Sequence, residues 1–423
     1  MKKVQTVKGT HDLLADDFLL FDKIINCFET LCRHFNYTKI ATPILEFTDL
    51  FSRTLGKSSD IVSKEMYTFI DQGKDSLTLR PEGTAPVARA LVSNSLYENL
   101  SQKFYYFGPM FRRERPQAGR LRQFHQFGVE YFNNKSFQCE IEIIILAQKI
   151  LLDLSILNEV KLNINTLGNQ KSRNKFKLKL VEYFSKYKNE LSNDSKARLE
   201  KNPLRILDSK DPSDKKLIET SPKILSFLDD DSRFFYESFK ETLLKLNINF
   251  VENPNLVRGL DYYNHTAFEF IELNKQSNNN TILAGGRYDG LVNAIGGKDV
   301  CGVGWAAGIE RISSIISKNH IIKNNFIISI FTLSDELDLI LLKVIKKIKN
   351  HKNFSFNIIY SGSVKKKFSR ANKIHSKACL IFGPDEYKDG NMIFKDLNSG
   401  TQEIFKISKV NDFLMNKSKN LKS

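Results

Sequence analysis

Cysteine pairs, long apolar runs and an export signal are all missing from this sequence. The chain has only five cysteines and no Cys-x-x-Cys pair, so neither a zinc site nor a disulfide framework is indicated. No uninterrupted apolar run reaches the roughly 18 residues that a membrane span requires. The N-terminal stretch MKKVQTVKGTHDLL is basic but lacks the apolar core of a secretory signal. We therefore expect a cytoplasmic protein with no membrane association and no metal of its own.

Acidic residues are outnumbered by basic ones, 48 to 64, which gives a formal net charge of +16. Such a charge favours polyanionic partners, because released counterions drive the binding of phosphate groups. Lysine, asparagine and isoleucine are abundant throughout, so the charge could equally reflect genome composition. At 423 residues the chain predicts two or three domains, given about 150 residues per domain.

Glycine is absent between Gly168 and Gly259, where lysine, glutamate and leucine are dense and apolar residues recur at helical spacing. This texture predicts a helical insertion over about residues 169–245. Beyond residue 325 strand-like and helix-like runs alternate, as in FIISIFT, DELDLILLKVIKKIKN and FSFNIIY, which is typical of a small α/β domain with a parallel sheet. We expect one domain over 1–322 and another over 325–423.

The first 160 residues mix helix and strand signals. Apolar spacing predicts a helix over 17–35, and TFIDQGKDSLTLRPEG reads as two strands around a glycine turn. A helix should follow in TAPVARALVSNSL, with Thr84 as its N-cap. KFYYFGPMFRRE and RQFHQFGVEYF alternate around the polar loop PQAGRL, which predicts a long antiparallel hairpin.

Five arginines crowd that hairpin within eleven positions: Arg112, Arg113, Arg115, Arg120 and Arg122. About half of the side chains on alternating strands share a face, and arginines on one face repel unless an anion lies between them. Their forked guanidinium groups suit phosphate oxygens. The alternative is a solvated hairpin edge, where basic residues discourage aggregation.

Two glycine-containing stretches also stand out. GVGWAAGIERI has the spacing Gly-x-Gly-x-x-x-Gly without a suitably placed acid, which argues against a dinucleotide loop and favours close packing of a strand on a helix below a ligand. LVRGLDYYNHTAFEF gathers an arginine, an aspartate and two tyrosines around one glycine. A tyrosine pair alone would be compatible with an ordinary amphipathic core.

The segment with Pro43, the arginine hairpin and the stretch ending in Glu310 and Arg311 resemble the three signature motifs of class II aminoacyl-tRNA synthetases. RGLDYY, AGGRYDGL and TLRPEGT narrow the resemblance to the histidyl-tRNA synthetases. The similarity extends from KGTHDLL to FGPDE and KDLNSGTQE and is least secure in the insertion. It implies an α+β catalytic domain with a six-stranded antiparallel sheet flanked by helices, a helical insertion, a homodimer formed through the first motif, and a C-terminal α/β domain that contacts the anticodon.

The implied reaction joins histidine to ATP, accompanied by Mg²⁺, and then transfers histidine to tRNA(His). An anion attacks an anion in the first step, so positive groups must neutralise the charge that develops at phosphorus. The resemblance implies catalytic roles for Arg112 and Arg258, and ATP binding by Arg112, Glu114 and Arg311. No general base is needed, because a carboxylate is already ionised at neutral pH. The acceptor end of tRNA is expected to meet Arg115 and Gln117.

Free histidine presents an ammonium, a carboxylate and an imidazole, so its pocket needs matched donors and acceptors at both ends. Polar matching of this kind can reject analogues by about 10⁴ to 10⁵, which would explain why no editing domain is apparent. The resemblance implies that the histidine site consists of Glu82, Gly83, Thr84 and Gln126 at the amino end and Glu130, Tyr262 and Tyr263 at the imidazole end.

Other polar residues are expected to be structural. His125, within FHQF, is not needed as a general base, and Asp229 to Asp231 suit a solvated loop better than a metal site. The basic helix with Lys365, Lys366, Lys367 and Arg370 either contacts tRNA phosphates or forms a solvated face.

Two rival functions remain compatible with parts of the sequence. One is the synthetase-like regulatory subunit of ATP phosphoribosyltransferase, which lacks the C-terminal module; Arg258, the hairpin arginines and the FGPDE segment argue against it. The other is a basic nucleic-acid-binding protein that uses the scaffold only for dimerisation.

Overall fold

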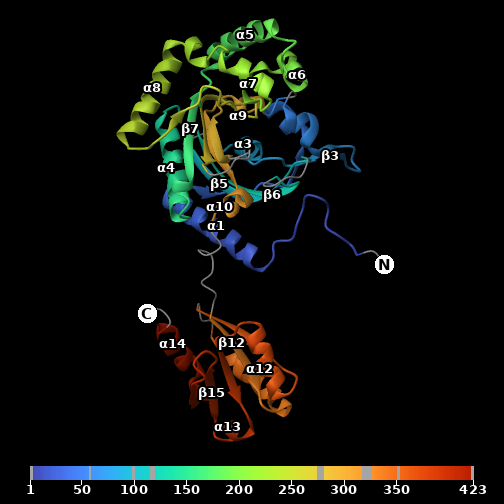
Figure 1. The fold of residues 1–423 in the computed structure, drawn as a ribbon, viewed down its shortest axis with the longest axis vertical. Helices are drawn as coiled ribbons and strands as arrows, with labels where there is room; N and C mark the ends of the chain where they lie inside the picture. Colours follow the sequence, from blue (N-terminus) through green and yellow to red (C-terminus); the bar gives the residue numbers. More distant parts are fainter. Residues whose placement is uncertain are drawn as a thin grey trace. The chain divides into compact units, whose positions relative to one another are not determined.

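The computed structural model describes residues 3–56, 59–97, 101–114, 120–273, 281–316, 326–349 and 353–420. The chain divides into two compact units, Met1–Ile321 and Ile322–Ser423 (Figure 1). Each unit has its own hydrophobic core, around Phe28 and Trp305 in the first and around Ile330 and Leu380 in the second. Arg115 and Gln117, expected at the tRNA acceptor end, lie outside the described residues.

The first unit is built on an eight-stranded sheet. Its six central strands pair antiparallel, as expected. In sheet order these are β5 (Gln102–Phe111), β6 (Gln123–Phe132), β11 (Gly302–Gly308), β10 (Thr281–Arg287), β9 (Asn264–Glu272) and β7 (Val160–Thr166). Two short edge strands, β1 (Thr38–Lys39) and β8 (Val251–Glu252), pair parallel with β5 and β7, so the sheet is mixed and larger than expected.

Helices cover both faces of this sheet (Figure 1). Tyr105 of β5 joins the core beneath α1 (Ala15–His34), α4 (Gln138–Asp153) and α10 (Ile309–Ile315). Its neighbour Tyr106 joins the opposite core, which includes α3 (Thr84–Ser93) and α9 (Leu291–Ala294). This division follows from strand geometry, because successive side chains point to opposite faces.

The segment after β1 forms a separate three-stranded sheet in the order β2 (Leu45–Phe47), β4 (Ser76–Leu79) and β3 (Tyr67–Ile70). A helix, α2 (Thr48–Thr54), and a π-helical turn, Ile61–Glu65, connect β2 to β3. The hairpin of β3 and β4 pairs antiparallel around Gly73, as the turn pattern predicts.

The expected N-cap of α3 is wrong by one residue. Gly83 occupies the cap position, and the Glu82 carboxylate accepts hydrogen bonds from the backbone N–H groups of Thr84 and Ala85, at 2.7 and 2.8 Å. Thr84 cannot cap the helix because its hydroxyl donates instead to Oε1 of Glu130 at 2.7 Å. A carboxylate at this end also suits the positive pole of the helix dipole.

Helices fill the region expected to form the insertion. They are α5 (Gln170–Lys186), α6 (Asn193–Lys201), η3 (Pro203–Asp208), α7 (Pro212–Glu219), η4 (Ile224–Phe227) and α8 (Asp230–Lys245). Phe176, Leu180 and Phe184 of α5 pack into a core that belongs to the insertion, whereas Tyr236 and Phe239 of α8 join the core beneath the main sheet.

The acidic run Asp229 to Asp231 starts a helix. Asp229 is the N-cap of α8 and accepts a hydrogen bond from the backbone N–H of Ser232 at 3.0 Å.

Within the described ranges no group of three or more potential metal ligands occurs. None of the described helices is both long and apolar enough to cross a membrane.

The second unit has a five-stranded sheet in the order β13 (Phe354–Ile358), β12 (Phe326–Thr332), β14 (Ala378–Phe382), β15 (Asn391–Asp396) and β16 (Gln402–Lys406). The expected parallel sheet is correct for the first three strands only. β15 and β16 pair antiparallel, because the turn LNSGT, with Gly400 at φ +74°, reverses the chain. The helices are α11 (Asp338–Lys347), α12 (Val364–Lys373), α13 (Pro384–Lys388) and α14 (Val410–Asn420).

The basic helix α12 presents only part of its charge to solvent. Lys365, Lys366 and Arg370 are exposed. Lys367 is 1% exposed, and its Nζ donates to the carbonyl of Thr332 at 3.1 Å and to Oδ1 of Asp335 at 3.0 Å. Lys367 therefore anchors the helix to β12, and neither alternative considered for this helix, a phosphate contact or a solvated face, is correct for Lys367.

Candidate active site

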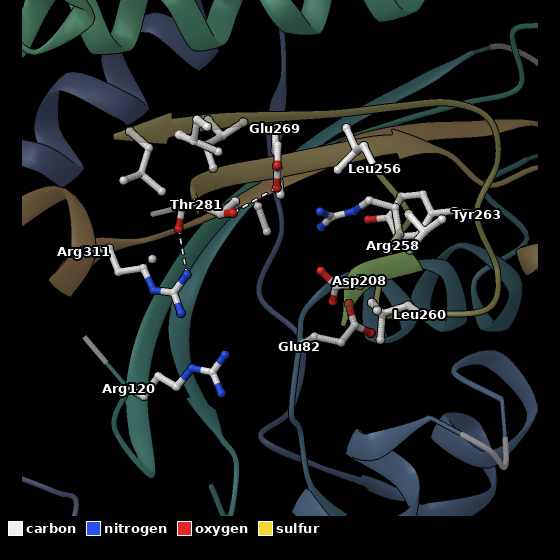
Figure 2. Close-up of a pocket in the computed structure, with 18 of the residues that line it drawn as sticks. Glu82, Arg120, Asp208, Leu256, Arg258, Leu260, Tyr263, Glu269, Thr281 and Arg311 are labelled. Atoms are coloured by element: carbon white, nitrogen blue, oxygen red, sulfur yellow. Dashed lines mark hydrogen bonds between the residues drawn. The ribbon is translucent and has the colours of Figure 1, made fainter. Parts of the chain in front are cut away.

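A cavity of about 900 Å³ opens within the first unit. Its walls combine the start of α3, the β5–β6 hairpin, the segment 253–263, strand β10 and the start of α10 (Figure 2). The insertion forms another part of the wall, through Leu207 to Lys210, Lys215 and Glu219. Segments that are far apart in sequence thus meet around one space.

Arg112, Arg258 and Arg311 all line this cavity. Nε of Arg112 donates to the carbonyl of Pro81 at 2.9 Å, and an Nη1 of Arg311 donates to the carbonyl of Thr281 at 2.7 Å. Figure 2 shows Arg311 near one wall, while Arg258 extends from the opposite wall beside Tyr263. These hydrogen bonds fix where the Arg112 and Arg311 guanidinium groups lie along the cavity wall.

The positive groups in the cavity repel one another. Burial, followed by the nearby charges of Arg120 and Arg112, lowers the pKa of Arg311, and Glu114 opposes that effect. Arg120 also lines the cavity and forms an ion pair with Glu114 at 2.7 Å. A bound anion would relieve this repulsion.

The hairpin arginines therefore divide into two groups. Arg112 and Arg120 line the cavity, as expected of an anion site. Arg113 is exposed, and neither it nor Arg122 lines the cavity. The sequence pattern identified the cluster but could not say which members converge.

Uncharged and acidic polar side chains also line this cavity. Glu82, Thr84, Gln126, Tyr262 and Tyr263 all line it. Among the described residues, Oε1 of Gln126 and the hydroxyl of Tyr262 are buried and have no hydrogen-bond partner. Buried polar atoms normally have a partner, so these atoms are suited to a polar ligand.

Two of the expected histidine-site residues lie behind the cavity wall. Glu130 is fully buried and accepts hydrogen bonds from Thr84 and from the hydroxyl of Tyr288. Gly83 is also absent from the wall, and a Cβ there would lie 2.1 Å from the Tyr106 ring. Their positions support the wall instead of forming its surface.

Comparison with known proteins identifies the family. The family model described as histidyl-tRNA synthetase matches residues 9–169, and the one described as an anticodon-binding domain matches residues 326–417. A histidine–tRNA ligase from Rhodospirillum rubrum is 43% identical over 416 residues, which is 98% of this chain and 99% of the relative. The chain belongs to the histidyl-tRNA synthetase family. The resemblance seen in its motifs is thereby confirmed.

A solved histidyl-tRNA synthetase from S. aureus, in its apo form, has 32% identity and a TM-score of 0.80, and covers 97% of this chain and 99% of its own. A Bacillus halodurans structure described as an ATP phosphoribosyltransferase regulatory subunit/histidyl-tRNA synthetase has a TM-score of 0.63 at 19% identity, covering 90% of this chain and 99% of its own. At that identity the comparison shows the shared fold alone.

Sequence reasoning missed several residues that line this cavity or support its wall. Tyr288 binds Glu130, and the tyrosine within GGRYDGL was a signal that could have been followed. Glu310 lines the cavity and accepts from the backbone N–H of His125 and pairs with its Nδ1, at 2.9 Å each, which supports the structural role expected for this histidine. Asp208 and Lys210 of the insertion have no sequence signal, because no motif marks them.

Glu130 gives this synthetase a testable pH dependence. Burial raises the pKa of Glu130 from 4.5 to about 8, although hydrogen bonds from Tyr288 and Thr84 act in the opposite direction. Between these two values the folded protein binds a proton more tightly than the unfolded chain, so this residue's contribution to stability falls as pH rises. Glutamine at position 130 mimics the neutral carboxyl and does not titrate. As the pH rises through this range, we therefore expect the Tm of the wild type to fall relative to the Tm of Glu130→Gln.

The measurement is the thermal unfolding of both ligand-free proteins near pH 5, near pH 6.5 and near pH 8. A difference in Tm that stays constant across these conditions would show that Glu130 does not titrate in this window.

Proposed function

We infer that this chain is a histidine–tRNA ligase that activates histidine with ATP and transfers it to the 3′ end of tRNA(His). The observation that carries this function is the meeting of Arg112, Arg258 and Arg311 around one cavity that also holds the unpartnered Gln126 and Tyr262 atoms. The first set of groups suits a triphosphate, and the second suits a polar amino acid.

In the first step a carboxylate oxygen of histidine attacks the α-phosphorus of ATP and diphosphate leaves. Arg112 and Arg258 approach the reacting groups from different walls and neutralise the charge that grows on the phosphoryl oxygens. Arg311 and the Glu114–Arg120 pair lie where they can hold the rest of the nucleotide. In the second step a terminal ribose hydroxyl of tRNA attacks the acyl carbon and AMP leaves.

Magnesium would enter this site with ATP. The cavity wall includes the carboxylates of Glu114, Glu269 and Glu310, and Mg²⁺ is usually held by one or two carboxylates together with substrate phosphates. When bound, the ion would help to neutralise the triphosphate. Arg112, Arg258 and Arg311 position the substrates within the cavity.

Recognition of histidine is assigned to both ends of the polar region. We assign the amino group to Glu82, Thr84 and Gln126, and the imidazole to Tyr262 and Tyr263. Glu130 would act on the imidazole end from behind the wall, through its contacts with Thr84 and Tyr288. Arg115 and Gln117 remain the proposed contacts for the tRNA acceptor end, and the second unit is proposed to contact the anticodon, in the cytoplasm.

The experiment that tests this function is amino-acid-dependent exchange between ATP and labelled diphosphate, run with all twenty amino acids. We expect exchange with histidine alone, followed by charging of tRNA(His). If purified, folded protein exchanges with none of them, the enzyme assignment is wrong and a regulatory relative becomes the better interpretation.

A homodimer is proposed from the surface of the three-stranded sheet. Leu45, Phe47 and Phe69 are 45%, 60% and 43% exposed. Phe47 and Phe69 both lie opposite Leu77, so their side chains share one face, and Leu45 shares it by strand alternation. An exposed apolar face of this kind is typical of an interface.

We expect sedimentation to give twice the chain mass of 48.7 kDa, and Phe47→Glu to shift the protein towards the monomer because it places a charge in the apolar face. The control is Phe234→Glu, which replaces a 74%-exposed side chain on α8. A wild type that remains monomeric at every concentration tested would contradict the dimer.

A further inference from the structure

The segment that carries Arg258 has no regular structure of its own. Residues 256–263 lie between strands β8 and β9 and belong to no helix or strand. Carbonyl groups in such a segment have no partner within a helix or sheet, so their hydrogen-bond donors must come from elsewhere. Three alternate carbonyls, those of Gly259, Asp261 and Tyr263, accept hydrogen bonds from arginines of the helical insertion.

Arg173 of α5 holds two of these carbonyls. Its Nη1 donates to the carbonyl of Tyr263 at 2.7 Å, and its Nη2 donates to the carbonyl of Asp261 at 2.9 Å. A planar guanidinium that spans two acceptors fixes their relative position, which a single ammonium cannot do. Arg173 thus sets the backbone on the C-terminal side of Arg258.

Arg205 of η3 holds the third carbonyl. Its Nη1 donates to the carbonyl of Gly259 at 2.9 Å, and its Nη2 pairs with Oδ2 of Asp60 at 2.8 Å. Asp60 lies just before the π-helical turn at Ile61–Glu65, outside the insertion. Arg205 therefore connects the residue next to Arg258 to a second part of the catalytic framework.

Asp261 contacts both the insertion and the C-terminal end of α2. Its Oδ1 accepts from Nδ2 of Asn202 at 2.6 Å, and its backbone N–H donates to the carbonyl of Leu55 at 3.4 Å. A Cβ on Gly56 would lie 2.2 Å from Oδ2 of Asp261, so only glycine leaves room for this side chain. The aspartate of RGLDYY thereby fixes the loop from both sides.

A cavity of about 10 Å³ lies within the same contact region, lined in part by Asn202, Arg205 and Arg258. Each of these side chains has one buried atom without a partner among the described residues: Oδ1 of Asn202, Nε of Arg205 and Nε of Arg258. The volume is roughly that of one water molecule. A water there would accept from the two Nε–H groups and donate to Asn202, which would join Arg258 to the insertion.

We propose that Arg173, Asn202 and Arg205 of the insertion are positioning residues, which hold Arg258 in its reactive orientation by clamping its loop and sharing a one-water site with it. The proposal rests on the proposed function, because it assigns a consequence to the role of Arg258 in adenylate formation. It gives the insertion a part in the first chemical step, which needs no tRNA.

The test is a double-mutant cycle, with the single-turnover rate of adenylate formation as its readout. We expect Arg205→Met to lower that rate about tenfold in the wild-type background and less than twofold in an Arg258→Ala background, because Arg205 acts through Arg258. Arg205→Lys should recover part of the rate. The control is Arg233→Met, which removes an insertion arginine whose Nη2 donates to the carbonyl of Leu225 at 3.2 Å and not to the 256–263 segment.

If the two single-variant losses in the rate of adenylate formation multiply in the double variant, Arg205 acts independently of Arg258. That result would overturn the proposal. So would an unchanged rate in folded Arg205→Met. If Arg205→Met does not fold, Arg205→Lys takes its place in the cycle under the same criterion. Failure of the proposed function looks different, since the wild type itself would then form no adenylate or Arg258→Ala would be fully active.

Discussion

Arg258→Ala is expected to slow histidyl-adenylate formation by about 10² to 10³, the usual cost of removing one fixed charge partner of a transition state. Arg258 lines the large cavity opposite Arg311, and its guanidinium carbon lies 5.4 Å from the centre of the Tyr263 ring. Negative charge on the phosphoryl oxygens increases only as the new bond forms. The loss should therefore appear mainly in the rate constant, with the affinity for histidine much less affected.

Single-turnover kinetics over a range of histidine concentrations separate these two quantities. The matched control is Arg113→Ala, because Arg113 belongs to the same arginine-rich hairpin as Arg112 but is exposed and does not line the cavity. It should form adenylate at the wild-type rate in the absence of tRNA. An Arg258 variant with an unchanged rate constant would remove this residue from the chemistry.

Local sequence patterns predicted the framework of the catalytic unit well. Alternation on both sides of PQAGRL specified the β5–β6 hairpin, whose register runs from Gln102 opposite Phe132 to Phe111 opposite Gln123. The missing glycines marked the helical region between 168 and 259. Strands β1 and β8 were missed because two residues are too short to show any periodicity.

The site itself depends on contacts that no local pattern contains. Arg112 and Arg311 are almost 200 positions apart, and only the fold, or the resemblance to a family, brings them together. Polar groups in the interior also redistribute their hydrogen bonds: Thr84 gives its hydroxyl to Glu130 and leaves the helix cap to Glu82. Lys367 is a second example. A run of lysines on an amphipathic helix does not reveal which lysine faces inward, and here it is Lys367.

A shortened chain that ends at residue 325 is expected to keep histidine-dependent exchange but to charge tRNA(His) about 100-fold less efficiently or worse. The first unit keeps its own cores and every described residue of the large cavity, so amino-acid activation does not require the second unit. Transfer differs, because one tRNA is proposed to be held by both units. Joining two binding modules typically raises overall affinity by about 10² to 10⁴, and that gain is lost when one module is removed.

Charging efficiency, as kcat/KM for tRNA, and exchange rate should be measured on the same preparations. A full-length variant with Lys365→Glu and Lys366→Glu provides the intermediate case, since both lysines are exposed on α12. It should weaken charging without altering exchange, and the defect should shrink as salt rises, because screening also weakens the wild type's phosphate contacts. Equal losses of exchange and charging in the shortened chain would mean that the second unit supports the catalytic fold, and the division of labour proposed for the two units would be wrong.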